Sequence, residues 1–229
     1  MRRFIPLAIW IILSAGFLSG CTRTSDEAGM RKGEKLVYDI KPAGSAVYHD
    51  RGIVERAGKK MHLTVFKADI LGFHDTENIY SDQETMLPLY VDREVSLWLK
   101  KEKIIEEYDQ EHFILTVTKY RGDKKISERT LKKTGPIHNA VLLPFLLRGY
   151  QDFPDGWEMP VRLTKDFNVQ FEGREVVTVP AGKFDAYHFK SSGNTFEAWI
   201  SSDTRRIPLR IRGLGKLGYS LELKGYSVK

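Results

Sequence analysis

The clearest indication of the fold is a short alternating segment, Leu36-Val37-Tyr38-Asp39-Ile40-Lys41. Leu36, Tyr38 and Ile40 stand at every second position, so in an extended chain their side chains lie on one face. A hydrophobic period of two is typical of a strand with one buried face. We therefore expect the folded part of the chain to begin with a half-buried β-strand.

The same alternation recurs further along the chain, at 61–66, 113–118 and 207–212. Residues that favour turns separate the alternating segments: they are Ala57-Gly58, Arg121-Gly122-Asp123, Asp155-Gly156, Pro180-Ala181-Gly182 and Ser192-Gly193-Asn194. About a dozen strands fit this pattern, mostly joined by hairpins. Because such a meander must close, curl or cover its edges, the sequence predicts an all-β, mainly antiparallel fold: a curled sheet, a half-barrel or a barrel-like meander.

The stretch 137–148 differs from this pattern because it is leucine-rich and apolar on most sides. Pro136 suits the first turn of a helix, and Gly149 suits its end. Pro144 would remove an internal hydrogen bond and so kink or divide that helix. We expect one inserted apolar helix near 137–148, buried against the concave side of the sheet.

The N-terminal segment has the pattern of an export signal. Arg2 and Arg3 precede an apolar run from Phe4 to Leu18, which is short for a transmembrane helix. Leu18-Ser19-Gly20-Cys21 then looks like the lipobox of bacterial lipoproteins. We expect residues 1–20 to be removed by cleavage between Gly20 and Cys21. The alternative is an uncleaved anchor or an ordinary signal with an incidental cysteine.

Cys21 is the only cysteine of the chain, so no internal disulfide is possible. We expect its thiol to carry a diacylglyceryl lipid, with residues 21–32 as the lipidated terminus and tether, and 33–229 as a single antiparallel β domain. Thr22 stands where many inner-membrane lipoproteins carry aspartate. The expected location is therefore the cell envelope, on the outer membrane facing the periplasm.

The composition limits the classes of partner that the exported chain is expected to bind. The formal charge of +6 falls to +4 once the two arginines of the signal are removed, which is too mild to indicate nucleic acid. Hydrophobic residues make up 41% of the chain, enough for a packed core. A membrane, through the lipid anchor, and a lipid, a glycan or an envelope protein are the partners that we expect.

The sequence contains no recognisable catalytic constellation. Gly213 to Gly218 matches G-x-G-x-x-G, but too few residues follow for a dinucleotide fold. We interpret it as a glycine-rich hairpin or bulge before a strand over 219–228. The histidines have no metal-ligand spacing, and the carboxylates of 106–111 are interpreted as a solvated hairpin end. We expect no catalytic residue, no metal and no cofactor besides the lipid on Cys21.

Three arginines near the C-terminus form the most suggestive feature. Arg206, Arg210 and Arg212 alternate with apolar residues along one segment. The simplest interpretation is the solvated face of an antiparallel strand. The sharper hypothesis is a contact with phosphate or carboxylate groups, which guanidinium groups bind in a bidentate manner.

Large apolar residues supply a second hypothesis, a cavity for an acyl chain or a sugar. At strand spacing such side chains are usually core, and that is the alternative interpretation. The residues that we assign to the lining are Trp98, Trp157, Trp199, Leu142, Phe145 and Leu146.

Several stretches together resemble a bacterial periplasmic family catalogued as domain of unknown function 3108. The most specific are Val179-Pro180-Ala181-Gly182-Lys183-Phe184-Asp185-Ala186-Tyr187 and Ala198-Trp199-Ile200-Ser201-Ser202-Asp203-Thr204-Arg205-Arg206-Ile207-Pro208-Leu209. Gly33 to Ile40, Pro42 to Gly44 and Met86 to Leu89 add shorter matches in the same order. The resemblance implies an envelope location and an antiparallel β fold. It implies no reaction and transfers no site residue.

Three functions remain open at this point. The leading hypothesis is a non-enzymatic binding or carrier module for an apolar or anionic envelope ligand. The second is a structural or assembly protein that docks on an envelope complex. The third, which the missing catalytic motif disfavours, is an enzyme acting on cell-wall or glycan material.

Overall fold

The computed structural model describes residues 31–213 and 218–228. The predicted signal peptide, Cys21 and all of the tether before Arg31 lie outside the described residues, as do 214–217 of the glycine-rich segment. Within the described ranges, none of the helical structure has the length and apolar character that crossing a bilayer would need.

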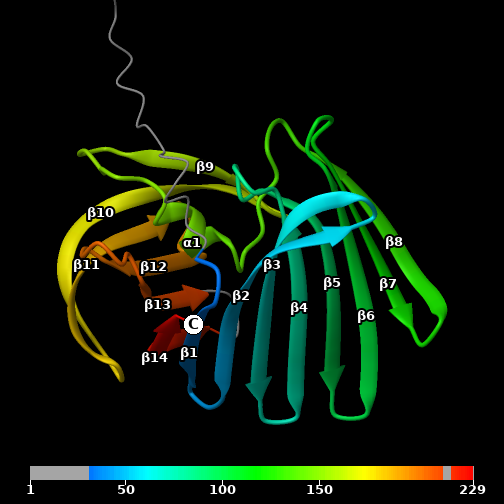
Figure 1. Cartoon of the computed structure of the whole chain (residues 1–229), viewed down its shortest axis with the longest axis horizontal. Coiled ribbons are helices and arrows are strands. Elements are labelled where there is room, and N and C mark those ends of the chain that lie inside the picture. Colours follow the sequence, from blue (N-terminus) through cyan, green and yellow to red (C-terminus); the bar gives the residue numbers. More distant parts are fainter. Residues whose placement is uncertain (1–30, 214–217, 229) are drawn as a thin grey trace, which may run out of the picture.

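Fourteen strands make one continuous sheet (Figure 1). They are β1 (Glu34–Lys41), β2 (Ser45–Arg56), β3 (Lys59–Ile70), β4 (Phe73–Ser81), β5 (Pro88–Leu97), β6 (Lys100–Asp109), β7 (Ile114–Arg121), β8 (Lys124–Lys132), β9 (Glu158–Arg162), β10 (Asp166–Val179), β11 (Gly182–Ser191), β12 (Phe196–Ser201), β13 (Pro208–Gly213) and β14 (Tyr219–Val228). Every pairing is antiparallel, and the order β8-β7-β6-β5-β4-β3-β2-β1-β14-β13-β12-β11-β10-β9 leaves β8 and β9 as the two edges. The predicted all-β, antiparallel curled sheet is confirmed, in its open form.

The sheet is strongly curved, and β11–β14 turn to face β2–β5 across the concave side (Figure 1). Register shifts along the sheet help to explain the curvature, because a β-bulge bends its strand and increases the local twist. They occur at Val37/Tyr38, Asp50/Gly52, Tyr80/Ser81, Lys119/Tyr120, Phe171/Gly173 and Trp199/Ile200.

The alternating segment 36–41 lies in the middle of this sheet. In β1, Leu36, Tyr38 and Ile40 are buried, as their alternation predicts. The Tyr38 hydroxyl donates a hydrogen bond of 3.0 Å to the carbonyl oxygen of Pro208, so β1 is tied to the beginning of β13. Period-two alternation therefore places the core face of the central strand correctly.

Strand β3 uses the opposite face from the one its apolar residues suggest. His62 and Thr64 are buried, whereas Met61, Leu63 and Val65 are only partly buried on the other side. The reason lies in β2, where the Asp50 carboxylate faces the His62 ring with 2.6 Å between Oδ1 and Nε2. A buried polar side chain is tolerated where it has such a partner.

The helix is much shorter than the sequence predicts, so the expectation of a helix over 137–148 is wrong in its extent. Only α1 (Leu143–Leu147) is helical within 137–148. The Asn139 side chain accepts hydrogen bonds from the backbone N–H groups of Val141 and Leu142, which makes a turn before the helix. Pro144 then occupies the first turn, where it loses no helical hydrogen bond. The segment of 133–157 that carries α1 crosses the concave side of the sheet (Figure 1).

The hairpin ends agree with the turn residues of the sequence. Ala57 and Gly58 both have positive φ between β2 and β3, and Gly182 and Gly193 do so at either end of β11. The glycine-rich segment separates β13 from β14, and β14 confirms the strand expected over 219–228. Asp109 pairs with His112 at the exposed β6–β7 turn, whereas the Tyr108 hydroxyl donates to Glu106 in a partly buried position.

Candidate functional site

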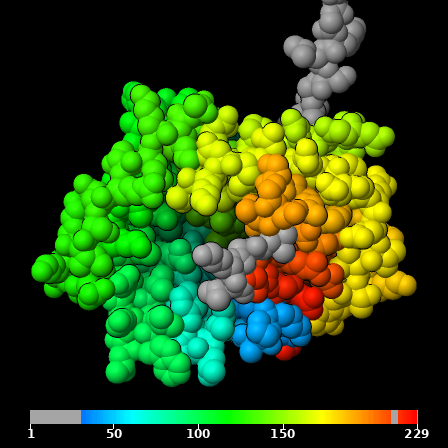
Figure 2. Space-filling view, turned by 180° about the vertical axis from the view of Figure 1, so that it is seen from behind, coloured from blue at the N-terminus to red at the C-terminus, as the bar shows by residue number. Residues whose placement is uncertain are grey.

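A cavity of about 750 Å³ lies between the concave face and the crossing segment. Its walls come from β1–β5, β13, β14 and α1, and most of its lining is apolar. The lining side chains include Tyr38, Ile40, Tyr48, Phe66, Ala68, Ile70, Phe73, Val141, Phe145, Ile211 and Leu221. Figure 2 views the molecule from behind and shows its surface hollowed between the green-cyan half, β3 to β8, and the red and orange strands.

The cavity opens toward the hairpins that join consecutive strands. Its lining includes Lys41 at the end of β1, Phe73 at the start of β4 and Leu97 at the end of β5. Lys41 is exposed and Leu97 is 49% exposed, so this rim faces solvent. The blue β1–β2 hairpin and the neighbouring cyan strands lie together at the lower edge in Figure 2.

Helix α1 closes the opposite side of the cavity. The Phe145 ring stacks on the Tyr48 ring of β2 with centroids 3.7 Å apart and planes 13° apart. Such a contact combines apolar burial with a favourable ring arrangement. The apolar floor is therefore built by a residue from the crossing segment and a residue from the sheet.

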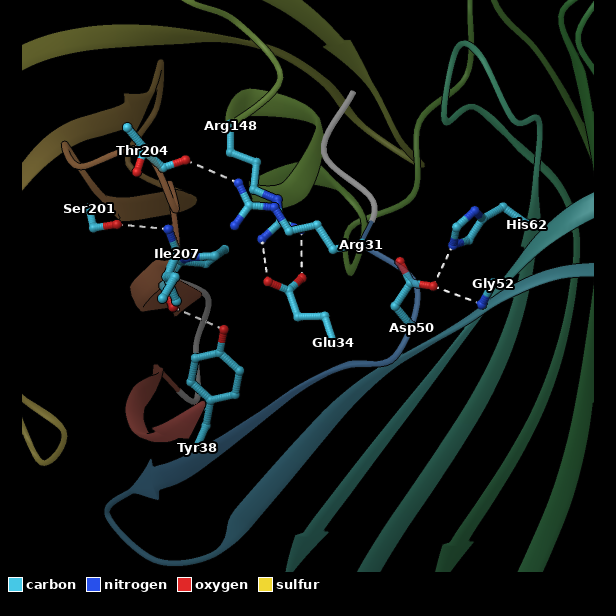
Figure 3. Close-up of polar contacts among 11 residues, drawn as sticks. Arg31, Glu34, Tyr38, Asp50, Gly52, His62, Arg148, Ser201, Thr204 and Ile207 are labelled. Atoms are coloured by element: carbon cyan, nitrogen blue, oxygen red, sulfur yellow. Dashed lines mark hydrogen bonds and ion pairs between the residues drawn. The ribbon is translucent and has the colours of Figure 1, made fainter. Parts of the chain in front are cut away.

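A buried ion pair holds this crossing segment in place (Figure 3). The two terminal nitrogens of Arg148 donate to the two Glu34 carboxylate oxygens at 3.0 and 2.6 Å. Both side chains are almost inaccessible, with exposed fractions of 2% and 0%. Because Glu34 begins the central strand and Arg148 directly follows α1, this bidentate pair fixes the floor to the middle of the sheet.

One wall of the otherwise apolar cavity is charged. Arg93 of β5 donates to both carboxylate oxygens of Asp75 on β4, and its Nε lies 3.3 Å from Glu77 Oε1. Asp75 and Glu77 are buried, and Arg93 is partly buried. Asp75 lies opposite Ala68 of β3, so the charged wall is in direct contact with the apolar one.

Glu77 titrates near neutrality. Burial raises the pKa of its carboxyl from 4.5 to about 7, with Asp75 and Glu106 adding to the increase and Arg93 and Asn139 opposing it. The Glu77 carboxyl can therefore accept a hydrogen bond or donate one within the physiological range. A cavity with this wall suits a molecule that is mostly apolar and carries one polar group.

The structure separates the six residues that we assigned to a cavity lining. Phe145 lines the cavity, whereas Leu146 belongs to the main core and Leu142 to a second buried cluster under β4–β7. Trp157 lies in an aromatic cluster with Tyr150 and Phe153. The other two tryptophans assigned to the lining also lie outside the cavity. Trp98 is 73% exposed in the β5–β6 turn, and Trp199 stacks on His188.

The three arginines proposed for an anionic contact each have partners within the chain. Arg206 donates to the carbonyl oxygens of Tyr150 and Gln151. Arg210 pairs with Glu222 at 3.1 Å. Arg212 lies 3.5 Å from Glu197, and both Arg210 and Arg212 lie over the Trp199 ring. Arg210 and Arg212 are brought together along β13, on the strand face opposite the cavity-lining Ile211. Arg206 lies before β13 and contacts the crossing segment instead.

Sequence reasoning missed the charged wall. Asp75 and Glu77 alternate with exposed or partly buried residues in β4, in phase with buried Ile79. That phase is the signal that could have found them, because two acids in register with a buried isoleucine share its face. Arg93, their partner in the neighbouring strand, carries no comparable local signal.

Fold and site together define a class of protein: an open antiparallel half-barrel with a crossing segment that encloses an apolar cavity. A family model described as "Protein of unknown function (DUF3108)" matches residues 37–224. The chain belongs to this family. The sequence resemblance that indicated it is confirmed.

Further comparisons add neighbours in shape only. No curated protein matches the sequence. A beta-barrel-like protein of domain of unknown function DUF1849 from Brucella abortus has a TM-score of 0.49 and 10% identity, over 86% of this chain and 97% of that chain. A "putative lipoprotein" from Parabacteroides distasonis has a TM-score of 0.32 and 9% identity, over 86% and 96% of the two chains.

Proposed function

We propose that this protein is a non-enzymatic carrier of an amphiphilic molecule with an acyl chain. The observation that carries the proposal is the cavity of about 750 Å³ with its mainly apolar lining. Binding cavities for small molecules measure about 300–1,000 Å³ and combine apolar walls with a few polar groups. The acyl chain of the ligand would lie among Ile40, Phe66 and Phe145. The ligand would enter the cavity through the rim of hairpins.

The charged wall assigns a place to the polar group of the ligand. Asp75 and Glu77 are the third and fifth residues of β4, counted from Phe73 at the rim. A headgroup near the mouth would meet these carboxyls and Arg93 while the acyl chain extends toward α1. Arg93 provides a cation for an anionic oxygen, and protonated Glu77 provides a donor.

Two other functions are weaker on the same observations. Both carboxylates of the charged wall bind one guanidinium, so we propose no acid/base pair and no enzymatic reaction. A structural or assembly protein would present an exposed docking surface and would not need an enclosed apolar cavity. Docking on an envelope complex is the function that a failure of the carrier proposal would favour.

Native mass spectrometry tests the carrier proposal directly. The chain from residue 22 onward contains every strand of the sheet and is purified from a periplasmic expression. We expect a retained mass of lipid size and saturable binding of a fluorescent long-chain fatty acid. Ala68→Trp should fill the cavity and weaken that binding at least tenfold. Lys67→Trp is the matched control, because Lys67 is exposed and its neighbour Ala68 faces the cavity.

The outcomes of this experiment are distinct. Retained lipid that Ala68→Trp removes and Lys67→Trp leaves in place supports the carrier. An apo mass together with no fatty-acid binding by the unmodified chain rejects it. Equal binding by the unmodified chain and the Ala68→Trp variant would also reject this cavity as the site.

We also propose that the protein is anchored through a lipid on Cys21, on the outer membrane facing the periplasm. Support comes from the lipobox and from Thr22 after the cysteine. Cys21→Ser should move the protein out of the outer-membrane fraction while its thermal unfolding stays unchanged, because the folded sheet begins at Glu34. Outer-membrane association of the serine variant that withstands a high-salt wash as well as the original protein does would contradict the anchor.

A further inference from the structure

Three neighbouring hairpins form an apolar and basic surface beside the cavity mouth. We call it the three-hairpin tip and define it as residues 41–44, 70–73 and 97–101. It presents Leu71, Trp98 and Leu99 with exposed fractions of 86%, 73% and 99%. Large apolar side chains are rarely exposed to this extent side by side without a binding role.

The three hairpins are packed against one another. The Trp98 backbone N–H donates to the Gly72 carbonyl oxygen at 2.7 Å. A Cβ atom added to Gly72 would lie 3.0 Å from the Trp98 ring, and one added to Gly44 would lie 2.5 Å from the Asp69 carbonyl oxygen. The three turns therefore form one continuous surface.

The β5–β6 turn is built from residues that do not favour it. Leu97 pairs with Lys100, so the loop consists of Trp98 and Leu99 alone. Trp98 adopts φ of 54°, a left-handed conformation that two-residue hairpins normally give to asparagine or glycine. A bulky residue held there at an exposed tip indicates selection for what the side chain contacts.

The three-hairpin tip is positively charged, which favours an anionic partner. Lys41, Lys100 and Lys101 are exposed, and residues 41–44, 70–73 and 97–101 contain no acid. Asp69 and Glu102 border the tip, but Asp69 is paired with His74 at 2.5 Å and Glu102 with Arg121 at 2.7 Å. Lysine is depleted from protein interfaces, whereas leucine, tryptophan and lysine together suit the headgroup region of an anionic bilayer.

We propose that the three-hairpin tip inserts into the surface of an anionic lipid bilayer. Leu71, Trp98 and Leu99 enter the boundary between headgroups and acyl chains, and the three lysines contact the lipid phosphates. The same hairpins line the cavity mouth through Lys41, Phe73 and Leu97. When the tip is inserted in this way, the cavity opens directly onto the membrane surface, without an intervening layer of water.

Vesicle sedimentation tests this contact without any cargo. The chain from residue 22 onward is mixed with vesicles of phosphatidylcholine alone or with added phosphatidylglycerol. We expect binding to the anionic vesicles and at least tenfold weaker binding to the neutral ones. Leu71→Ser/Trp98→Ser/Leu99→Ser should reduce anionic binding at least tenfold, and Lys100→Glu/Lys101→Glu should remove the preference for phosphatidylglycerol.

The matched control is Ile53→Ser/Val176→Ser. These side chains are 58% and 54% exposed and lie in β2 and β10, away from the tip. The control should bind vesicles like the unmodified chain. No binding by the unmodified chain, or an equal loss in the control, overturns the proposal. Fatty-acid binding is measured in parallel without vesicles, so failure of the tip and failure of the carrier are separate results.

Discussion

Glu34→Met should lower the free energy of unfolding by about 3–5 kcal/mol, the largest stability effect that we expect in this protein. The variant leaves the Arg148 guanidinium without the carboxylate that accepts a hydrogen bond from each of its two terminal nitrogens. An arginine cannot lose its charge in a folded protein, so the uncompensated cation stays buried. Urea unfolding followed by circular dichroism measures the loss.

The double variant Glu34→Met/Arg148→Met separates charge from packing. Replacing a buried ion pair with apolar residues of similar volume is often neutral or stabilising. We therefore expect the double variant to recover most of the stability that Glu34→Met loses. A double variant at least as unstable as Glu34→Met would show that the pair is not the source of the effect.

Loss of the Glu34–Arg148 pair should also affect ligand binding. Arg148 follows α1, and the α1 residue Phe145 forms the cavity floor on Tyr48. The double variant keeps the apolar contacts, so it should bind a fatty acid more tightly than Glu34→Met does. The pair is thus a positioning element for the floor of the cavity.

The second large effect is a dependence of stability on pH that Glu77→Gln removes. The pKa of Glu77 in the folded chain is about 7, against an ordinary value of 4.5. Between these values the folded state holds a proton that the unfolded state releases. The contribution of Glu77 is therefore complete below about pH 4.5 and is lost as pH rises through 7, at a cost on the order of 3 kcal/mol.

Thermal unfolding of both proteins at pH 5, 6, 7 and 8 measures this effect. The melting temperature of Glu77→Gln relative to the unmodified chain should rise steadily with pH, by several degrees in all, at ~2–4 °C per kcal/mol. Burial lowers the pKa of His138 to about 4, but His138 is present in both proteins and cancels in the difference. Glu55→Gln, an exposed acid of β2, should show no such trend. A difference in melting temperature between Glu77→Gln and the unmodified chain that does not change with pH would contradict a Glu77 carboxyl that titrates near 7.

The sequence was most informative where structure depends on neighbours along the chain. The buried alternation of Leu36, Tyr38 and Ile40 and the turn at Ala57-Gly58 agree with the structure. Both are local, because a strand period and a positive φ depend on adjacent residues. The helix near 137–148 was overestimated because Asn139 and Pro144 delay its start to Leu143.

The candidate site was less accessible from the sequence. Of the six residues assigned to a lining, Phe145 lies beside the cavity, whereas Trp98 lies on the three-hairpin tip. An apolar residue has the same local pattern whether it faces a core, a cavity or a membrane. Only the curvature of the sheet separates these three environments.

The strands, the turns and the family of this protein could be predicted from local sequence patterns. The buried face of β3, the meeting of the β4 acids with Arg93 and the closure of the cavity depend on tertiary contacts. The contacts responsible join distant residues: Arg148 and Glu34 are 114 positions apart, and Tyr38 and Pro208 are 170 apart. Strand and turn preferences act within a few residues, whereas the enclosure of a cavity depends on how a sheet of 14 strands curls.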